Sequence, residues 1–110
     1  MKRGEIYWIN LDPTIGSEIQ KTRPGLILSN DINNVHAETV TILPLTSSVK
    51  HVHPFEVLVK PDSFDNDKPV KIKADQIRTV DKRRIGRLLG NLPQDLIPHV
   101  ERAVKLHLAL

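Results

Sequence analysis

The chain has 110 residues and a mass of 12.5 kDa, which predicts one domain spanning residues 1–110. Lys and Arg number 16 against 13 Asp and Glu, and hydrophobic residues make up 39%, so disorder of the whole chain is excluded. Cysteine is absent, which excludes disulfide scaffolds, thiolate metal sites and a cysteine nucleophile. The longest apolar run, residues 6–9, is too short to span a membrane, and no targeting segment follows Met1. We therefore expect a soluble, cytoplasmic protein without membrane contact.

The first two thirds of the chain is predicted to form short strands. They cover residues 5–11, 25–29, 39–45, 55–59 and 70–77. The first has apolar side chains on both faces, which is typical of a strand that is covered on both sides. Pro24 fits the first residue of the second strand, because proline cannot donate to a sheet interior. The stretches 12–23 and 31–38 read as polar connections, and the first is long enough to be a functional loop.

The apolar spacing changes to that of a helix near the C-terminus. Four apolar residues recur at intervals of four: Leu96, Val100, Val104 and Leu108. Asp95 is the predicted N-cap, and Pro98 then falls in the first turn, where its missing N–H has no helical partner. Short antiparallel strands followed by one helix predict a mainly β fold, a small and strongly bent barrel with the C-terminal helix packed on it.

Charge is unevenly distributed along the chain. Bases gather in residues 78–87, where Asp81 is the only acid, and Lys21 with Arg23 forms a second basic cluster. Acids collect in residues 62–67, apart from both clusters in the sequence. A polarised surface suits a polyanion such as a nucleic acid, because phosphate contacts supply affinity independent of sequence. A solvated charged face gives the same pattern, so charge alone leaves both interpretations open.

Two polar segments contain groups suited to phosphate. Residues 17–24 bring together carboxylate, amide, ammonium, hydroxyl and guanidinium groups, with Arg23 directly before a proline. Guanidinium geometry matches phosphate oxygens, although spacing alone favours a surface ion pair between Glu18 and a neighbouring base. The second segment, residues 44–48, ends a predicted strand with three hydroxyls, which suit either phosphate binding or turn capping.

A third polar segment closes the strand over residues 70–77. Lys73 and Asp75 share one face of this strand, so they could exchange protons with one substrate or neutralise each other. The residues that follow, up to Thr79, are polar enough to line a groove or to form a solvated edge. A metal site is not predicted, because His51 and His53 have no third ligand signalled nearby.

Taken together, these segments resemble the MazF/PemK (Kid) family of bacterial toxins, which are sequence-specific endoribonucleases. The matching segments are Arg3–Ile6, Leu11–Pro13, Gly16–Glu18, Lys21–Pro24, Pro44–Ser47 and Asp75–Asp81. The resemblance covers nearly the whole chain. It implies a PemK-like barrel related to SH3 folds, a homodimer, and single-stranded RNA bound in a groove across the dimer. It also implies a MazE-like antitoxin with an acidic tail as partner.

The resemblance further implies a reaction without metal or cofactor. The 2′-hydroxyl of the mRNA attacks the adjacent phosphorus and leaves a 2′,3′-cyclic phosphate and a 5′-hydroxyl. Arg23 and Thr46 match the family's catalytic arginine and threonine. One branch of the family uses an aspartate and an arginine where this chain has Asp75 and Lys73, with a histidine in the first loop, whereas no histidine precedes His36 here. We expect RNA binding or a supporting role for Glu18, Lys21, Ser47, Lys73, Asp75, Gln76 and Arg78.

Two other functions are compatible with the sequence. The first is a non-catalytic SH3-like barrel that binds RNA or a peptide, and the second is a metallohydrolase that uses His51 and His53. The presence of Arg23, Thr46 and Ser47 favours the ribonuclease.

Overall fold

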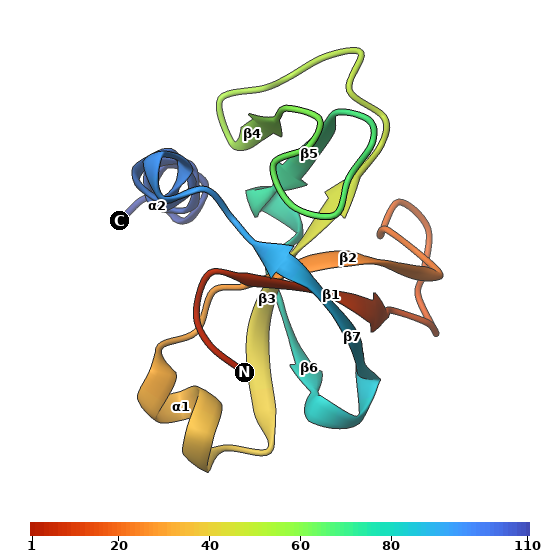
Figure 1. Ribbon diagram of the computed structural model, residues 1–110, viewed down its shortest axis with the longest axis vertical. Helices are drawn as coiled ribbons and strands as arrows, with labels where there is room; N and C mark the ends of the chain where they lie inside the picture. Colours follow the sequence, from red (N-terminus) through yellow and green to blue (C-terminus); the bar gives the residue numbers. More distant parts are fainter.

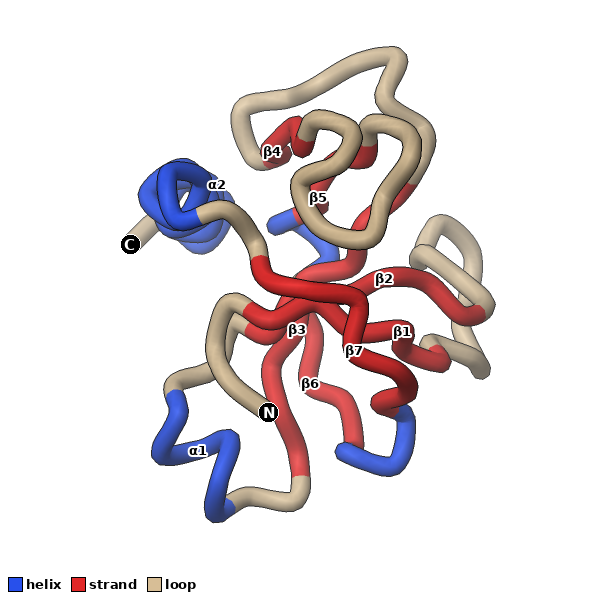
Figure 2. The backbone as a smooth tube through the Cα atoms, viewed as in Figure 1, coloured by secondary structure: helices blue, strands red, loops and turns tan.

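The computed structural model describes residues 1–110 and contains seven strands and two α-helices (Figure 1). The strands are β1 (Glu5–Asn10), β2 (Thr22–Ile27), β3 (Thr39–Thr46), β4 (Glu56–Val59), β5 (Val70–Lys73), β6 (Arg78–Asp81) and β7 (Ile85–Asn91). The helices are α1 (Asp31–His36) and α2 (Ile97–Leu108), and both lie at the periphery of the strands (Figure 2). None of the helices is long and apolar enough to cross a membrane.

All strand pairs are antiparallel, and β3 is the central strand, because it pairs with β2, β5 and β6. The sheet order is β4-β5-β3-β2-β1-β7, and β6 pairs with β3 outside this path. The first half of β3 pairs with β6, whereas its last two residues, Leu45 and Thr46, pair with β5. The mainly β fold with a C-terminal helix that the sequence predicts is therefore confirmed.

Two apolar clusters form the core, with 12 and six buried residues. Neighbouring residues of one strand belong to different clusters: Leu43 packs in the larger cluster and Ile42 in the smaller one. The same holds for Leu26 and Ile27 in β2, so β2 and β3 are covered on both faces. Helix α2 contributes Val100 and Ala103 to the larger cluster, and Leu96 and Val104 of the predicted apolar face pack against it, whereas Leu108 at the end of that face is exposed.

Helix α1 was not predicted, because residues 31–38 read as a polar connection. The helix has six residues, and its only buried side chain is the polar Asn34. Polar contacts stabilise it instead: Asn30 caps its N-terminus by accepting the Asn33 N–H at 2.9 Å. A helix without an apolar stripe leaves no period for sequence analysis to find.

Two boundary predictions at the helix and the second strand were wrong. Asp95 does not cap α2, because a 3₁₀ turn over Gln94–Leu96 leads directly into the helix, although Pro98 does lie in its first turn. Pro24 is an interior residue of β2, opposite Trp8, rather than its first residue. Proline is tolerated there because β2 pairs with β3 only from Gly25 onward.

The strand predicted over residues 70–77 is interrupted. It ends at Lys73 and continues as a 3₁₀ turn over Ala74–Gln76 before β6 begins at Arg78. Lys73 and Asp75 therefore do not share a strand face. The turn separates the partners of β3, since β5 and β6 pair with different parts of that strand.

Gly25 offers a test of the packing between β2 and the smaller cluster. A Cβ at this position would lie 2.4 Å from Cδ1 and 3.3 Å from Cγ1 of Ile9, which is fully buried. We expect Gly25→Ala to lower the free energy of unfolding by about 1–3 kcal/mol, measured by urea denaturation. Leu110→Ala removes an exposed side chain and should change it by less than about 0.5 kcal/mol. Equal stability of the two variants would contradict the tight packing at Gly25.

Candidate functional site

Arg23, Thr46 and Ser47 line one cavity of about 250 Å³, which we call the arginine cavity. Its wall is completed by side chains of β1, β7 and the connection between β4 and β5, including Trp8, Leu89 and Phe64. The register of β2 against β3 explains the meeting of Arg23 and Thr46. Gly25 lies opposite Pro44 in the last pair of this register, and Arg23 and Thr46 each lie two residues beyond that pair along their strands, where both line the cavity.

The guanidinium of Arg23 is available to a ligand. The side chain is exposed, and its single hydrogen bond runs from Nε to the Gln20 carbonyl oxygen at 3.2 Å. Both terminal amino groups are therefore open to an anion, which they can bind through two parallel hydrogen bonds. The alternative of an ion pair made by Glu18 is wrong, because Glu18 Oε1 instead accepts the Ile15 N–H at 2.7 Å.

The Thr46 hydroxyl has a structural contact as well as a place in the cavity. Its Oγ1 accepts the Ser48 N–H at 3.2 Å, as the turn-capping interpretation predicts. A hydroxyl that accepts one bond keeps its own hydrogen to donate, so capping does not prevent Thr46 from binding a phosphate oxygen.

Acidic residues reach the arginine cavity from a distant part of the sequence. Asp65 and Asp67 line it, although the sequence places them apart from the basic clusters. Asn66 fixes this connection: its Oδ1 accepts the backbone N–H groups of Ser63 and Phe64, at 3.0 and 2.9 Å. The cavity thus combines two cations, the open guanidinium of Arg23 and the exposed Lys68, with carboxylates at its edge, an arrangement that the linear charge pattern does not reveal.

Four other predicted residues gather in a second cavity of about 380 Å³, which we call the loop cavity. It is lined by Glu18, Asp75, Gln76 and Arg78 together with Ile15, Ser17 and Ile77. Lys21 and Lys73 line neither cavity. The structure therefore divides the predicted residues between two places rather than one.

Gln76 and Arg78 hold the long connection between β1 and β2. Gln76 accepts the Ile19 N–H at 2.7 Å and donates to the Ser17 carbonyl oxygen at 3.1 Å. Arg78 donates to the Leu11 carbonyl oxygen at 3.2 Å. Both side chains thus position this loop, a role that sequence analysis did not assign, because their partners lie more than 50 residues away.

Most basic side chains of residues 78–87 likewise bind other groups of the protein. Lys82 donates to the Asn34 carbonyl oxygen at 2.7 Å, and Arg84 donates to the Asn10 and Asp12 carbonyl oxygens. Arg83 pairs with Asp81, and its hydrogen bond to that carboxylate lowers the pKa of Asp81. The basic segment is therefore not a uniform surface of free cations, in contrast to the open guanidinium of Arg23.

Glu56 forms the centre of a buried ionic cluster that sequence analysis missed. Lys71 Nζ lies 3.1 Å from Glu56 Oε1, and Lys73 Nζ lies 3.0 Å from Oε2 in an ion pair without hydrogen-bond geometry. Lys73 also lies 3.8 Å from Asp75, as expected if these two residues neutralise each other. The alternation of residues 55–59 marks Glu56 as solvent-facing, yet its side chain is 0% exposed. The only sign of this cluster in the sequence is the pair of lysines, Lys71 and Lys73, in β5, the strand that pairs with β4.

The pKa of Glu56 is lowered to about 2 in spite of burial, which by itself raises it. The His53 N–H and the ammonium groups of Lys73 and Lys71 stabilise the carboxylate and outweigh the cost of burial. Glu56 is thus ionised at any pH at which the protein is expected to work.

His51 and His53 lie in the connection between β3 and β4. The His53 ring stacks on Phe55 with centroids 5.2 Å apart. No group of three or more His, Asp or Glu side chains is arranged to hold a metal ion. The His53 imidazole is placed for stacking on Phe55.

A family model described as PemK-like, MazF-like toxin of type II toxin–antitoxin system matches residues 2–108. The chain belongs to this toxin family. The prediction of the family from six sequence segments is confirmed.

Named relatives of this family agree with the match. Endoribonuclease MazF9 of Mycobacterium tuberculosis is 36% identical, over 100% of this chain and 98% of the relative. Endoribonuclease EndoA of Bacillus subtilis is 31% identical, over 100% of this chain and 96% of the relative. Both relatives are named as endoribonucleases, which agrees with the predicted ribonuclease rather than with the predicted non-catalytic barrel.

Solved structures resemble the fold of this PemK/MazF chain over its whole length. MazF of Deinococcus radiodurans superimposes with a TM-score of 0.87 at 28% identity, covering 100% of this chain and 97% of the other. A mycobacterial endoribonuclease in complex with its cognate antitoxin has a TM-score of 0.82 at 25% identity, covering 100% of this chain and 96% of the other.

The lowered pKa of Glu56 predicts a specific dependence of stability on pH. Because the carboxylate has a pKa of about 2 when folded and an ordinary value of 4.5, its contribution is fully present above about pH 5. It is lost as the pH falls toward 2. We expect Glu56→Gln to lower the free energy of unfolding at pH 7 by about 3 kcal/mol, and the difference to close toward pH 2.

Denaturation in urea at several pH values measures this difference. Glu101→Gln is the matched control, because it removes a carboxylate from a surface pair with Arg3 at 3.3 Å and should cost at most about 1 kcal/mol. A gap between wild type and Glu56→Gln that stays constant from pH 7 to pH 2 would contradict the ionic role of Glu56.

Proposed function

We propose that the chain is a sequence-specific, metal-independent endoribonuclease, the toxin of a toxin–antitoxin system, acting on single-stranded mRNA. The observation that carries this proposal is the arginine cavity, which is lined by an open guanidinium from β2 and a hydroxyl from β3. Family membership and the names of two relatives as endoribonucleases support it.

The proposed reaction needs no water in its first step. The 2′-oxygen of the substrate forms a bond to the adjacent phosphorus and loses its proton, while the bond from phosphorus to the 5′-oxygen breaks and that oxygen gains a proton. The products are a 2′,3′-cyclic phosphate and a 5′-hydroxyl. Negative charge accumulates on the nonbridging oxygens in the transition state, so a fixed cation lowers its free energy more than that of the ground state.

Arg23 and Thr46 are the proposed catalytic residues. Arg23 binds the nonbridging oxygens through its two free amino groups, because its Nε is already engaged with Gln20. Thr46 orients the phosphate or the attacking hydroxyl, and Ser47 lies beside it in the same cavity. Lys73 is paired with the buried Glu56 carboxylate at 3.0 Å, so in this scheme it is an electrostatic group rather than a proton donor.

Binding of RNA involves a wider set of residues. The loop cavity presents Glu18, Asp75, Gln76 and Arg78, and Asp75 Oδ1 is buried there without a hydrogen-bond partner. Such acceptors and donors suit the base edges of an unstacked strand. Lys21, exposed in the first loop, and Lys73 supply positive charge near the two cavities.

We propose the family's assembly for this protein as well. Residues 1–110 act as one domain, two copies form a homodimer, and the complex works in the cytoplasm without a cofactor. The partner is a MazE-like antitoxin whose acidic tail competes with RNA for the basic groove. Solved structures titled MazE–MazF from Deinococcus radiodurans support this partner, with identities of 26% and TM-scores from 0.75 to 0.78.

Removal of the open guanidinium tests the catalytic role of Arg23. We expect wild type to cleave single-stranded RNA in the presence of a chelator, and Arg23→Ala to lower kcat about 100- to 1,000-fold, the effect of one lost donor to the transition state. Sequencing of RNA ends after digestion of a long transcript measures rate, cleavage motif and end chemistry together.

Arg83→Ala is the matched control, since Arg83 is an exposed arginine paired with Asp81 and lines neither cavity. It should leave kcat unchanged. Full activity of Arg23→Ala would remove Arg23 from the mechanism. RNA binding by wild type without cyclic-phosphate products would favour a non-catalytic barrel, and activity that requires added zinc would favour the metallohydrolase.

The nature of the nucleophile predicts a substrate effect. An oligonucleotide with one 2′-deoxy nucleotide at the cleaved position should bind with nearly unchanged affinity but remain intact, because the attacking hydroxyl is missing. Gel analysis of this oligonucleotide beside the all-ribose version checks this. Cleavage of both at equal rates would point to an external nucleophile such as water.

A further inference from the structure

The loop over residues 47–55 connects the proposed catalytic hydroxyls to β4. It leaves β3 directly after Thr46, begins with Ser47 in the arginine cavity, and contains no helix or strand. Its residues 50–54 are exposed and include Lys50, His51 and His53. An ammonium and two imidazoles are groups that bind phosphate or stack on unpaired bases, so this loop can contact RNA beside the arginine cavity.

Two buried side chains from the sheet hold this loop. Glu56 Oε1 accepts the His53 N–H at 2.9 Å, and Lys71 Nζ donates to the His51 carbonyl oxygen at 2.6 Å. The two side chains also pair with each other at 3.1 Å, so the loop bonds and the ion pair form one network. No other side chain outside the loop forms a hydrogen bond with residues 49–53.

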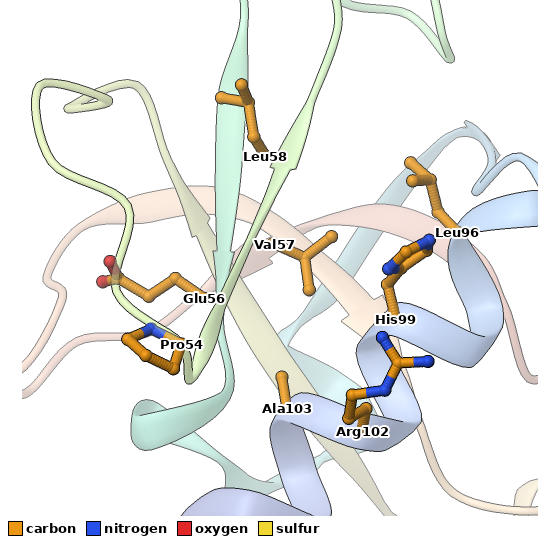
Figure 3. A pocket seen from close by; sticks show the side chains of 8 residues that line it. All are labelled: Pro54, Glu56, Val57, Leu58, Leu96, His99, Arg102 and Ala103. Carbon is orange, nitrogen blue, oxygen red and sulfur yellow. The ribbon is translucent and has the colours of Figure 1, made fainter.

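The orientation of Glu56 agrees with this role. Figure 3 shows its carboxylate directed away from His99 and Arg102 of α2 and toward the loop that leads into Pro54. The side chains of Glu56 and Lys71 are 0% and 9% exposed, and neither lines the arginine cavity. A buried ion pair contributes little stability beyond that of an apolar pair, so its clearest physical role here is to fix the path of the backbone that it binds.

We propose that Glu56 and Lys71 are positioning residues that fix the path of residues 47–55 and thereby determine which RNA sequence is accepted beside Arg23 and Thr46. This inference rests on the proposed ribonuclease function. Neither residue touches the substrate: Glu56 acts through the His53 backbone, and Lys71 acts through the carbonyl of His51.

Lys71→Met is the most selective test. Methionine fills a similar volume but cannot bind the His51 carbonyl, while Glu56 keeps its pair with Lys73 and its bond from His53. We expect the exchange of the His53 amide hydrogen with solvent, measured by NMR, to become about 10-fold faster. On a long transcript, kcat at the preferred sites should fall about 10- to 100-fold, and cleavage at other sequences should increase relative to it.

Lys71→Arg provides the rescue, because its guanidinium can bind both the carboxylate and the carbonyl. It should restore the wild-type ratio of cleavage at preferred and other sites. Glu101→Gln, which removes a surface pair outside this network, should leave both the ratio and the exchange rate unchanged. General destabilisation would lower cleavage at all sites by one factor, whereas loss of positioning changes their ratio.

The outcomes separate this inference from the proposed function. Unchanged His53 exchange in Lys71→Met, or an unchanged ratio of cleavage sites, would overturn the positioning role. If wild type cleaved no RNA, the proposed ribonuclease function would fail and the positioning of RNA would fail with it, while the exchange rates would still report whether Lys71 holds the loop.

Discussion

The antiparallel register between β2 and β3 is the constraint on which the proposed site depends. It places Gly25 opposite Pro44, and Arg23 and Thr46 follow two residues beyond this last pair, where both line the arginine cavity. A guanidinium and a hydroxyl thereby meet in one cavity although 22 residues separate them in the sequence. The register itself is strongly fixed, because β2 and β3 are buried on both faces and a shift by one residue would exchange the two apolar clusters. Core packing and chemistry are thus coupled through the same pair of strands.

The cationic side chains of this protein differ in the groups that they bind. Arg78, Lys82 and Arg84 bind backbone carbonyls, and Lys71 binds both a buried carboxylate and a loop carbonyl. These side chains hold loops and turns to the sheet. Arg23 is exposed, and its terminal amino groups have no protein partner. Because a developing negative charge is stabilised by a cation that is not already neutralised, local hydrogen bonding distinguishes Arg23 better than net charge does.

Sequence analysis predicted five of the seven strands, the C-terminal helix and the family, since each depends on local periodicity or on motifs in register, but it did not predict β6 and β7. It missed α1, whose stability comes from polar contacts such as the Asn30 cap rather than from an apolar stripe. It missed Glu56, because a buried ionised residue in an alternating strand has the same pattern as a solvent-facing one. It also separated Asp65 from Arg23, although both line the arginine cavity. The errors at Glu56 and Asp65 share one cause: the partners lie far apart in sequence, and single-chain patterns carry no information on their meeting.

The central claim is that Arg23 and Thr46 act on one phosphate as a unit, and a double-mutant cycle tests it most directly. Single-turnover cleavage rates would be measured for wild type, Arg23→Lys, Thr46→Val and the double variant on one RNA. Groups that stabilise the same transition state together are strongly non-additive, so the double variant should be little slower than the slower single variant. A double variant whose rate loss equals the product of the two single losses would show that the residues act independently and would contradict the account.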